Sequence, residues 1–454
     1  MRLYDAENAV LSAGSAFFIG IGGISMSSLA RYFRRLGKTV FGSDKTDGDE
    51  VRALMREGIK VYIGHDAKNV RGCDVVVFTG AVGDGNPELA EAKRLGIPTL
   101  SRAEFMGVLM KSRRTRIGIA GSHGKSTATA MAAHMMLAAK SDPVVMCGAK
   151  IPELGGAYRA GSGSFLFEAC EYKDSFLSFF PNIAVILNVD FDHTDYFKNI
   201  DEVVSSFSKF AKIASDDGGS VIACADDENA MRALKGEYPI TFGVCEDADY
   251  RAVDICEKNG AYSFSVLRCG EPFIKKISLS VVGYHNIYNA LACAALGDLL
   301  AVPAPVISAS LSDFSGISRR FEKKGRVGGA DVYIDYAHHP REISATLAAA
   351  RKICRGRLIS VFEPHTYSRT AALWSGFVSA FYDADVRIFT DVYAARETDT
   401  LGVSSEKLAK EAGGIYASSY EEAARAVTAE ANDGDVVMIL GAGNVYRVAD
   451  LLGG

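Results

Sequence analysis

The stretch "GIAGSHGKSTAT", residues 118–129, decides the fold of the central part of the chain. It follows the apolar run "TRIGIA" and opens the helix-forming run "STATAMAAHMM". Glycines in a strand-to-helix turn let backbone N–H groups face phosphate oxygens, and Lys125 would add positive charge there. Ile119 stands where a strict G-x-x-x-x-G-K-S/T pattern has glycine, so a turn that binds no phosphate remains the alternative.

A second glycine-rich turn, "GIGGISMSS", occupies residues 20–28. Gly20 and Gly22 fit the G-x-G-x-x-G pattern of a diphosphate-binding turn, whereas Ser25 takes the third glycine position. Asp44 ends the next apolar run, where a ribose-binding carboxylate would lie. The turn therefore predicts a diphosphate at a helix N-terminus, without distinguishing NAD from another nucleotide. A tight turn that binds nothing is the alternative.

The composition describes a chain of several globular domains. At 454 residues it is long enough for about three. The net charge of −5 arises from 50 basic and 55 acidic residues, which predicts no nucleic-acid partner. No apolar run reaches the ~18 residues of a membrane span, so we expect no membrane insertion. Nine scattered cysteines without C-x-x-C spacing predict reduced thiols and a cytoplasmic location.

Short apolar runs alternate with helical patterns along most of the chain, which predicts an α/β fold with parallel sheets. The basic run "KSRRTR", residues 111–116, is interpreted as a linker, and residues 261–281 as antiparallel hairpin strands. We expect an N-terminal Rossmann-like domain over 1–111 and a central P-loop ATPase-type domain over 112–317. A C-terminal Rossmann-like domain is expected over 318–454.

Acidic and histidine side chains gather after two strands of the predicted central sheet. The residues concerned are Glu168, Glu171, Asn188, Asp190, Asp192, His193 and Asp195. Ligand sites form at the carboxyl ends of parallel strands, where the glycine-rich loop also lies. Carboxylate oxygens suit Mg²⁺, and an imidazole can complete a second site. The alternative is that these acidic residues only cap the helix predicted over 199–211.

Taken together, these motifs resemble the Mur ligase family, the ATP-dependent amide-bond ligases of peptidoglycan precursor synthesis. The resemblance covers nearly the whole chain. Its motifs are "GSHGKST" at 121–127, "GYHNIYNALA" at 283–292, "SRRFE" at 318–322, "DYAHHP" at 335–340, "EPHTYSRT" at 363–370 and "GAGNVYRVADLL" at 441–452.

Within the family, "GIGGISMSSLA", "FEACEYKDSFL" and "NVDFDHTDYF" look most like the branch that adds L-alanine to UDP-N-acetylmuramate. Sibling ligases carry a carbamoylated lysine at the place of Phe207, so the group that replaces its charge is left open. The resemblance implies that ATP phosphorylates the lactyl carboxylate and that the amine of alanine displaces phosphate from the acyl phosphate. Catalytic roles are implied for Lys125, Glu168, His193 and His338, and a Mg²⁺ site for Ser126, Glu168 and His193, with Glu171 as the alternative carboxylate.

The resemblance also implies three binding sites. The ATP site comprises Gly121, Ser122, His123, Gly124, Lys125, Ser126, Thr127, His285, Asn289, Arg320 and Asp335. The UDP-sugar site comprises Gly20, Gly22, Gly23, Ile24, Asp44, His65 and Thr79. The amino-acid site comprises Tyr336, His339, His365 and Arg369, although "AHHP" can also be a simple strand-end turn and Arg369 a surface helix residue.

Three other functions remain open at this point. A recycling ligase would join the same UDP-sugar to a ready-made peptide. A nicotinamide-dependent oxidoreductase would use the first glycine turn, and Ser25 counts against it. A P-loop ATPase acting as a binding switch would leave the C-terminal motifs unexplained. We expect small-molecule partners, namely ATP, UDP-N-acetylmuramate and L-alanine, and a monomer or weak homodimer.

Overall fold

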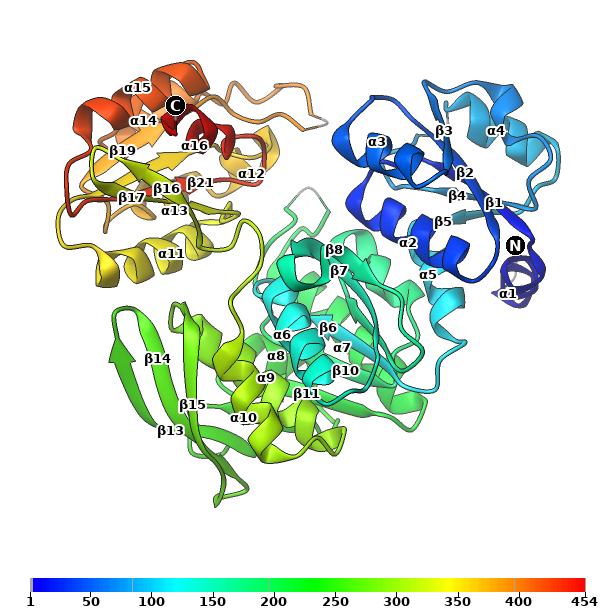
Figure 1. The fold of residues 1–454 in the computed structure, drawn as a ribbon, viewed down its shortest axis with the longest axis horizontal. Coiled ribbons are helices and arrows are strands. Elements are labelled where there is room, and N and C mark those ends of the chain that lie inside the picture. Colours follow the sequence, from blue (N-terminus) through cyan, green and yellow to red (C-terminus); the bar gives the residue numbers. More distant parts are fainter. Residues whose placement is uncertain (1–2, 84, 195, 396, 454) are drawn as a thin grey trace.

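The computed structural model describes residues 3–83, 85–194, 196–395 and 397–453. Asp195 lies outside the described residues. Three separate sheets follow one another along the chain, and helices pack beside each (Figure 1). This arrangement confirms the predicted three-part α/β architecture. No helix in the described ranges is long and apolar enough to cross a membrane.

The first sheet has five parallel strands in the order β3-β2-β1-β4-β5. Its strands are β1 (Ser15–Ile19), β2 (Thr39–Asp44), β3 (Lys60–Ile63), β4 (Val75–Phe78) and β5 (Thr99–Ser101). Its helices are α1 (Leu3–Ser12), α2 (Ile24–Arg35), α3 (Asp49–Arg56), the 3₁₀ turn η1 (Ala67–Val70), α4 (Pro87–Arg94) and α5 (Arg102–Met110). The glycine turn between β1 and α2 lies at the carboxyl edge, where the strand order reverses and ligands bind in such sheets.

The central sheet is mixed and has ten strands, in the order β15-β14-β13-β12-β11-β10-β6-β9-β7-β8. Its strands are β6 (Arg116–Ala120), β7 (Val144–Ile151), β8 (Gly156–Arg159), β9 (Phe165–Glu168), β10 (Ile183–Ile186), β11 (Ser220–Cys224), β12 (Ile240–Gly243), β13 (Tyr250–Lys258), β14 (Ala261–Arg268) and β15 (Glu271–Val282). Its helices are α6 (Lys125–Ala138), η2 (Pro152–Leu154), η3 (Tyr172–Ser178), α7 (Ile200–Asp216), α8 (Glu228–Ala233), α9 (His285–Leu299) and α10 (Ala304–Asp313). The predicted linker is one residue shorter than expected, because Arg116 already begins β6.

The third sheet has six strands in the order β16-β17-β21-β18-β19-β20, and only the β16–β17 pair is antiparallel. Its strands are β16 (Glu322–Val327), β17 (Ala330–Asp335), β18 (Leu358–Phe362), β19 (Val386–Phe389), β20 (Ile415–Tyr416) and β21 (Val436–Leu440). Its helices are α11 (Pro340–Ile353), α12 (Tyr367–Ala372), α13 (Trp374–Ser379), α14 (Ser405–Glu411), α15 (Tyr420–Glu430) and α16 (Arg447–Leu452). Strands β18 and β21 are buried along their whole length, which explains why they are apolar throughout except at Ser360 of β18.

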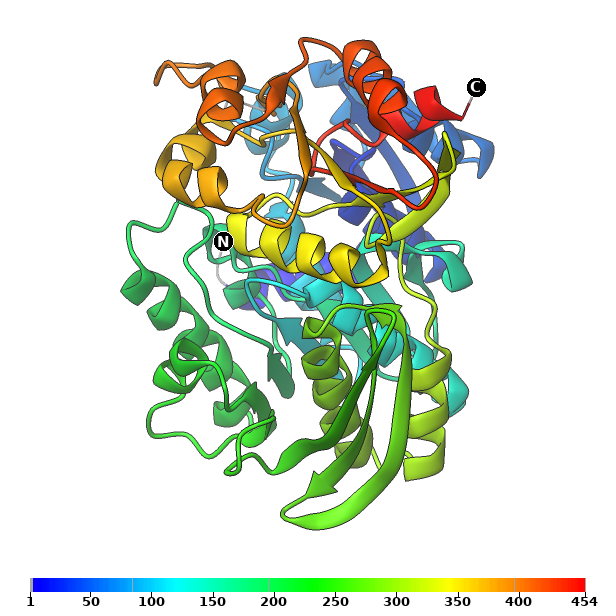
Figure 2. The ribbon, with the colours of Figure 1, turned by 90° about the vertical axis from the view of Figure 1, so that its left-hand side faces the viewer.

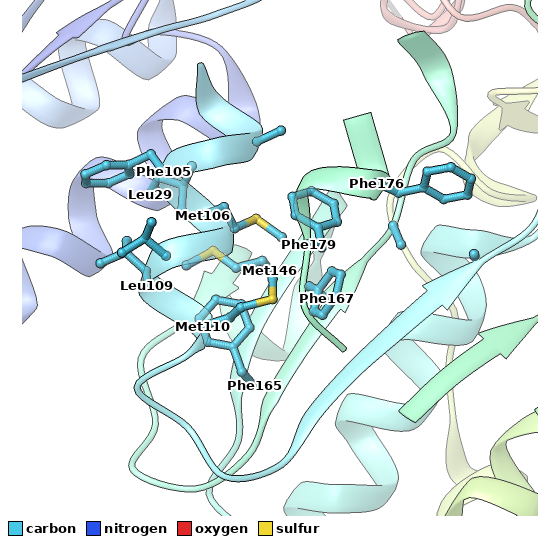
Figure 3. Close-up of a cluster of buried hydrophobic side chains, with 14 of the residues drawn as sticks. Leu29, Phe105, Met106, Leu109, Met110, Met146, Phe165, Phe167, Phe176 and Phe179 are labelled. Atoms are coloured by element: carbon cyan, nitrogen blue, oxygen red, sulfur yellow. The ribbon is translucent and has the colours of Figure 1, made fainter. Parts of the chain in front are cut away.

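One hydrophobic cluster continues from the first sheet's helices into the central sheet (Figure 3). Helix α5 supplies its middle, and the Met110 sulfur lies 3.2 Å from the backbone nitrogen of Phe180. A side chain at Gly107 would have no room, because its Cβ would lie 2.1 Å from the Ser178 carbonyl oxygen. The cluster shown includes Leu29, Phe105, Met106, Leu109, Met110, Met146, Phe165, Phe167, Phe176 and Phe179. The first two parts of the chain therefore share one hydrophobic core.

Two apolar clusters cover the two faces of the third sheet, and both consist of residues from the third part of the chain alone. Helix α11 lies between this sheet and the central part of the chain (Figure 2). The contacts that cross this boundary include ion pairs at the glycine-rich loop and at the segment after β10, which are described below. The two boundaries of the central sheet thus differ in chemistry, one apolar and one charged.

Candidate active site

The loop between β6 and α6 has a backbone that only glycine fits at two points. Gly121 and Gly124 have φ angles of +147° and +82°. A Cβ atom at Gly124 would lie 2.8 Å from the Asn289 side-chain oxygen, and one at Gly121 would lie 2.9 Å from the Cβ of Leu187. The loop is therefore packed tightly against α9 and the end of β10, with backbone N–H groups available at the start of α6.

Lys125 folds back over this loop. Its ammonium nitrogen donates to the carbonyl oxygens of Gly121 and Ser122, at 2.5 and 3.1 Å, and lies 3.0 Å from Glu171 Oε2. Burial alone would lower the pKa of Lys125, but the charge of the buried Glu171 carboxylate raises it above its usual value. The loop thus carries a permanent positive charge, as a phosphate site requires.

A cavity of about 540 Å³ opens beside the loop. It runs between α9, the segment before β16 and helix α11, so both the central and the third part of the chain enclose it. Predicted ATP residues in its lining are His123, Gly124, Thr127, His285, Asn289, Arg320 and Asp335. Burial and the nearby Arg320 lower the pKa of His285 to about 4, so this imidazole is neutral at physiological pH. The volume suits a nucleotide-sized ligand.

Glu168, at the end of β9, faces the start of α6. Its Oε2 accepts hydrogen bonds from Ser126 Oγ at 2.8 Å and from the Gly148 backbone nitrogen at 2.7 Å. A Cβ atom at Gly148 would lie 2.7 Å from the same oxygen, so the carboxylate sits in a cradle that glycine leaves open. Hydroxyl and carboxylate oxygens are ligands that Mg²⁺ prefers, and these residues fit that ion.

His193, in contrast, contacts the other carboxylate. Its Nε2 lies 3.4 Å from Glu171 Oε1, and its ring centroid lies 4.8 Å from that of Tyr172. The predicted metal set therefore falls into two neighbouring groups, with Ser126 and Glu168 in one and His193 with Glu171 in the other. Burial would lower the pKa of His193, yet hydrogen bonding to Cys170 and Glu171 raises it to about 10.

The segment that carries His193 is shaped for this contact rather than for helix capping. His193 has a φ of +54°, a left-handed conformation that costs a side chain of this kind about 1–3 kcal/mol. Helix α7 is instead capped by Asn199, whose side chain accepts from the Glu202 nitrogen at 3.0 Å. The capping alternative for Asp190 and Asp192 is therefore wrong. Phe207 is fully buried and its ring centroid lies 5.3 Å from that of Phe176, so no charge occupies that position.

A second cavity, of about 410 Å³, lies between the first and central sheets. Gly23, Ile24 and Thr79 line it from the N-terminal side, and Glu168 lines it from the central side. The Ser126–Glu168 hydrogen bond therefore joins the glycine-rich loop beside the first cavity to the wall of the second cavity.

Arg102, at the start of α5, also lines the second cavity and was not predicted from the sequence. Burial lowers the pKa of its guanidinium, which the charges of Cys170 and Glu168 partly offset. Among the described residues it has no ion-pair or hydrogen-bond partner. An unpaired cation in this setting is a candidate for binding an anion. The only sequence feature that marked Arg102 was its place at the start of a helix.

The turn between β1 and α2 is held by Asp44 and packed under Thr79. Asp44 Oδ2 accepts from the Gly22 backbone nitrogen at 2.9 Å. Gly20 has a φ of +79°, and a Cβ there would lie 2.6 Å from Thr79 Cγ2. His65 lies farther along this edge, with Nδ1 2.7 Å from Glu88 Oε2.

Glu88 is fully buried and also accepts from Ser43 Oγ, at 2.6 Å. The Glu88 carboxylate fixes the orientation of His65. It was not predicted from the sequence, because it lies 23 positions away in the chain.

His123 connects the glycine-rich loop to the third part of the chain. Its Nδ1 lies 3.2 Å from Glu342 Oε1, on α11, and its Nε2 lies 3.1 Å from Asp190 Oδ2. Arg341 reaches the same Asp190 oxygen at 3.0 Å. Burial would lower the pKa of His123, but its hydrogen bonds to Asp190 and Glu342 raise it to about 9. Glu342 was not predicted, because only the folded chain brings it to this loop.

Arg369 makes the most enclosed contact of this boundary. It is 8% exposed, and its guanidinium donates to Asp192 Oδ1 at 3.1 and 3.2 Å. The alternative of a surface helix residue is therefore wrong. His365 lies beside it, with Nδ1 3.3 Å from Arg369 Nη1. A substrate carboxylate at this arginine would have to replace or share Asp192.

The segment after β17 brings several predicted residues to the same edge. The Asp335 carboxylate accepts from the backbone nitrogens of Phe321 and Ala337, at 2.8 and 2.7 Å, and burial raises its pKa. His339 caps α11, with Nδ1 accepting from the Arg341 nitrogen at 3.3 Å. His338 stacks edge-on between two other predicted residues, with ring centroids 5.3 Å from Tyr336 and 5.9 Å from His365. Burial lowers the pKa of His338 to about 3, so it is neutral at physiological pH.

Three family models match three successive parts of the chain. Residues 16–114 match the model described as Mur ligase family, catalytic domain. Residues 119–297 match the Mur ligase middle domain, and residues 319–443 match the Mur ligase, glutamate ligase domain.

Curated relatives match over almost the full length. The UDP-N-acetylmuramate–L-alanine ligase of Caldanaerobacter subterraneus subsp. tengcongensis is 46% identical, over 95% of this chain and 96% of its own. The ligase of the same name from Clostridium novyi is 43% identical, over 96% of each chain. The crystal structure of the UDP-N-acetylmuramate–alanine ligase of Thermotoga maritima superposes with a TM-score of 0.82, at 26% identity, over 97% of this chain and 98% of that one. The chain belongs to the Mur ligase family.

Proposed function

We propose that this protein is an ATP-dependent ligase that joins L-alanine to the lactyl carboxylate of UDP-N-acetylmuramate. The observation that carries the proposal is the Ser126–Glu168 hydrogen bond, which links the glycine-rich loop beside the first cavity to the wall of the second. One cavity lies along a P-loop-like turn and the other along a diphosphate-type turn. A phosphoryl group held at the first could therefore reach a carboxylate held at the second. The names of the full-length relatives supply the substrates.

A carboxylate is a poor electrophile, so the reaction needs activation. Transfer of the γ-phosphoryl group of ATP onto the lactyl carboxylate would give an acyl phosphate and ADP. The alanine amine then attacks the acyl carbon, forming the amide bond as phosphate leaves and the amine loses a proton. Lys125 would stabilise the negative charge on the phosphoryl group as it passes from ADP to the lactyl carboxylate, since catalysis of this kind is mainly positioning and electrostatics.

Ser126 and Glu168 would hold Mg²⁺, and His193 belongs to the neighbouring group around Glu171. When bound, the ion would supply positive charge to the phosphate oxygens. The rest of the loop (Gly121, Ser122, Gly124 and Thr127) would hold phosphates. Asp335 would bind the ribose, and His285, Asn289 and Arg320 would complete the nucleotide cavity.

The UDP-sugar would place its diphosphate at the turn formed by Gly20, Gly22, Gly23 and Ile24, at the N-terminus of α2. Asp44 and His65 would contribute from the following strands and Thr79 from the cavity wall. Arg102 would bind the anionic end of this substrate that approaches Glu168.

L-Alanine would enter beside Tyr336, His338, His339, His365 and Arg369. Because the pKa of His338 is about 3, its neutral imidazole would accept a hydrogen bond from the uncharged amine but would not retain the amine proton. Arg369 would bind the amino-acid carboxylate in exchange for Asp192. We further propose domain limits of 1–111, 112–317 and 318–454, a cytoplasmic location, and a monomer or weak homodimer.

The test is phosphate release from ATP with Mg²⁺ by the purified protein, omitting UDP-N-acetylmuramate and L-alanine in turn. We expect release only when both are present, with an amide product identified by mass. Release with a tripeptide in place of alanine would assign the protein to peptide recycling instead. A murein peptide ligase from Psychrobacter arcticus shares the fold, with a TM-score of 0.72, so this arm of the experiment is needed.

A further inference from the structure

Three side chains of different chemistry converge beside the loop of Lys125. Ligand atoms of Cys170, Glu171 and His193 all lie within 4.8 Å of one another. They come from two segments, the turn after β9 and the turn after β10, so the folded sheet alone brings them together. The proposed function uses Cys170 for nothing, and the hard oxygen ligands of Ser126 and Glu168 form a separate group.

The donor set is typical of zinc rather than of magnesium. Thiolate sulfur and imidazole nitrogen favour Zn²⁺, whereas Mg²⁺ prefers oxygen ligands alone. A tetrahedral ion about 2.1 Å from a nitrogen and an oxygen ligand holds the two about 3.4 Å apart. His193 Nε2 and Glu171 Oε1 are separated by 3.4 Å. The Cys170 sulfur, within 4.8 Å of both ligand atoms, would supply the third ligand.

The surroundings leave a fourth position open and limit the affinity. Cys170 lines the second cavity, so a water molecule or a substrate oxygen can complete the coordination. Glu171 is 1% exposed, which shields the site from solvent on its other side. Lys125 Nζ, 3.0 Å from Glu171 Oε2, would repel the ion. The site should therefore bind more weakly than a closed structural zinc site.

We propose that Cys170, Glu171 and His193 form an inhibitory site for a thiophilic divalent cation such as Zn²⁺. Occupation would hold Glu171 away from Lys125 and His193 away from the reacting groups. Because the ion lies between the glycine-rich loop and the second cavity, it would block the reaction without occupying the cavity beside α9.

Cadmium reports the site directly, since thiolate-to-cadmium charge transfer absorbs in the ultraviolet. The full-length protein, free of ATP and Mg²⁺, would be titrated with Cd²⁺ as wild type, as Cys170→Ser and as the control Cys256→Ser/Cys269→Ser. The two control cysteines are exposed and lie outside the site. We expect Cys170→Ser to lose one equivalent of the absorption that wild type shows, and the control to keep that equivalent. Equal titrations of wild type and Cys170→Ser would overturn the proposal.

A measurement on the wild-type protein removes any dependence on how a variant folds. Zinc K-edge X-ray absorption of the one-to-one complex should show one sulfur neighbour together with nitrogen and oxygen neighbours. A spectrum without sulfur, or with several sulfurs, would contradict this ligand set. In the ligase assay, the Zn²⁺ concentration that halves phosphate release should rise about tenfold or more in Cys170→Ser, and an unchanged concentration would count against inhibition at this site.

Discussion

At the residue scale, the least expected feature is a half-buried cation that has no ion-pair partner among the described residues. Arg102 lines the second cavity, opposite the glycine turn of the first sheet, and has no ionic partner among the described residues. A protein that holds a charge in this way loses stability for it, and a ligand can restore the missing contact.

We expect Arg102→Met to raise the KM for UDP-N-acetylmuramate about 10- to 100-fold, because a charge-assisted hydrogen bond is lost. The KM for ATP should stay unchanged. The melting temperature without substrate should not fall, since methionine fills similar space and no partner is stranded. Steady-state kinetics and thermal unfolding check both effects, with exposed Arg114→Ala as the control. A lowered melting temperature with an unchanged KM would show a structural role instead.

Gly124→Ala should abolish ATP binding and lower the melting temperature. The new Cβ would meet the Asn289 side chain at 2.8 Å, on a backbone with a φ of +82°. Gly155→Ala is the matched control, because Gly155 has a φ of +66° but no atom within 4 Å of an added Cβ. The control should lose only the left-handed penalty of about 1–2 kcal/mol. Calorimetry and nucleotide titration measure the two effects. Equal losses of stability and of ATP binding in the two variants would argue against tight packing of the loop on α9.

The residues that lie in contiguous motifs were predictable from the sequence. The loop that holds Lys125 and Ser126 is an example, because its glycines, lysine and hydroxyl are local requirements of phosphate binding. The partners of these residues were not predictable. Glu342 reaches His123, and Glu88 reaches His65, through packing between segments far apart in the chain. No local pattern marks such a carboxylate, because its role is set only by what it faces.

At the element scale, burial decided which strands the sequence could predict. Strands β10, β18 and β21 are buried throughout and appear as apolar runs, interrupted only by Ser360 in β18. Strand β16, "EKKGRV", lies exposed at the edge of its sheet and carries charged residues that resemble a loop. Its hairpin with β17 was therefore missed.

An element-scale prediction concerns His123, the loop residue that contacts α11. The pKa of His123 is about 9 in the folded chain, against about 6.5 when unfolded, so folding favours the protonated form. Its stabilising contribution is complete below pH 6.5 and is lost as the pH rises to about 9, by up to about 3 kcal/mol. Denaturant unfolding of wild type should show this loss, and His123→Gln should reduce the slope across that window, where His193, with a pKa of about 10, supplies the slope that remains. A variant as pH-sensitive as wild type would assign the effect to another group.

At the scale of the whole molecule, the charged boundary around Asp192 holds the third part of the chain against the central one. Arg369→Leu would remove the arginine partner of the buried Asp192 carboxylate, at a cost of about 3–5 kcal/mol. We expect the third part to swing away and the radius of gyration in X-ray scattering to increase. The control Arg351→Leu breaks a half-exposed pair with Asp385 within the third part and should leave the radius unchanged. An unchanged radius in Arg369→Leu would mean that other contacts suffice.

The apolar cluster around α5 has a consequence for how the chain melts and is synthesised. Because Met106 and Met110 belong equally to the first and central parts, neither can lose its structure without exposing the other. Three sheets should therefore give two heat-absorption peaks in calorimetry, one for residues up to about 317 and one for the remainder. On the ribosome, the emerging first sheet would keep its methionines exposed until β9 arrives. The growing chain would thus depend on chaperones in the interval between these two elements.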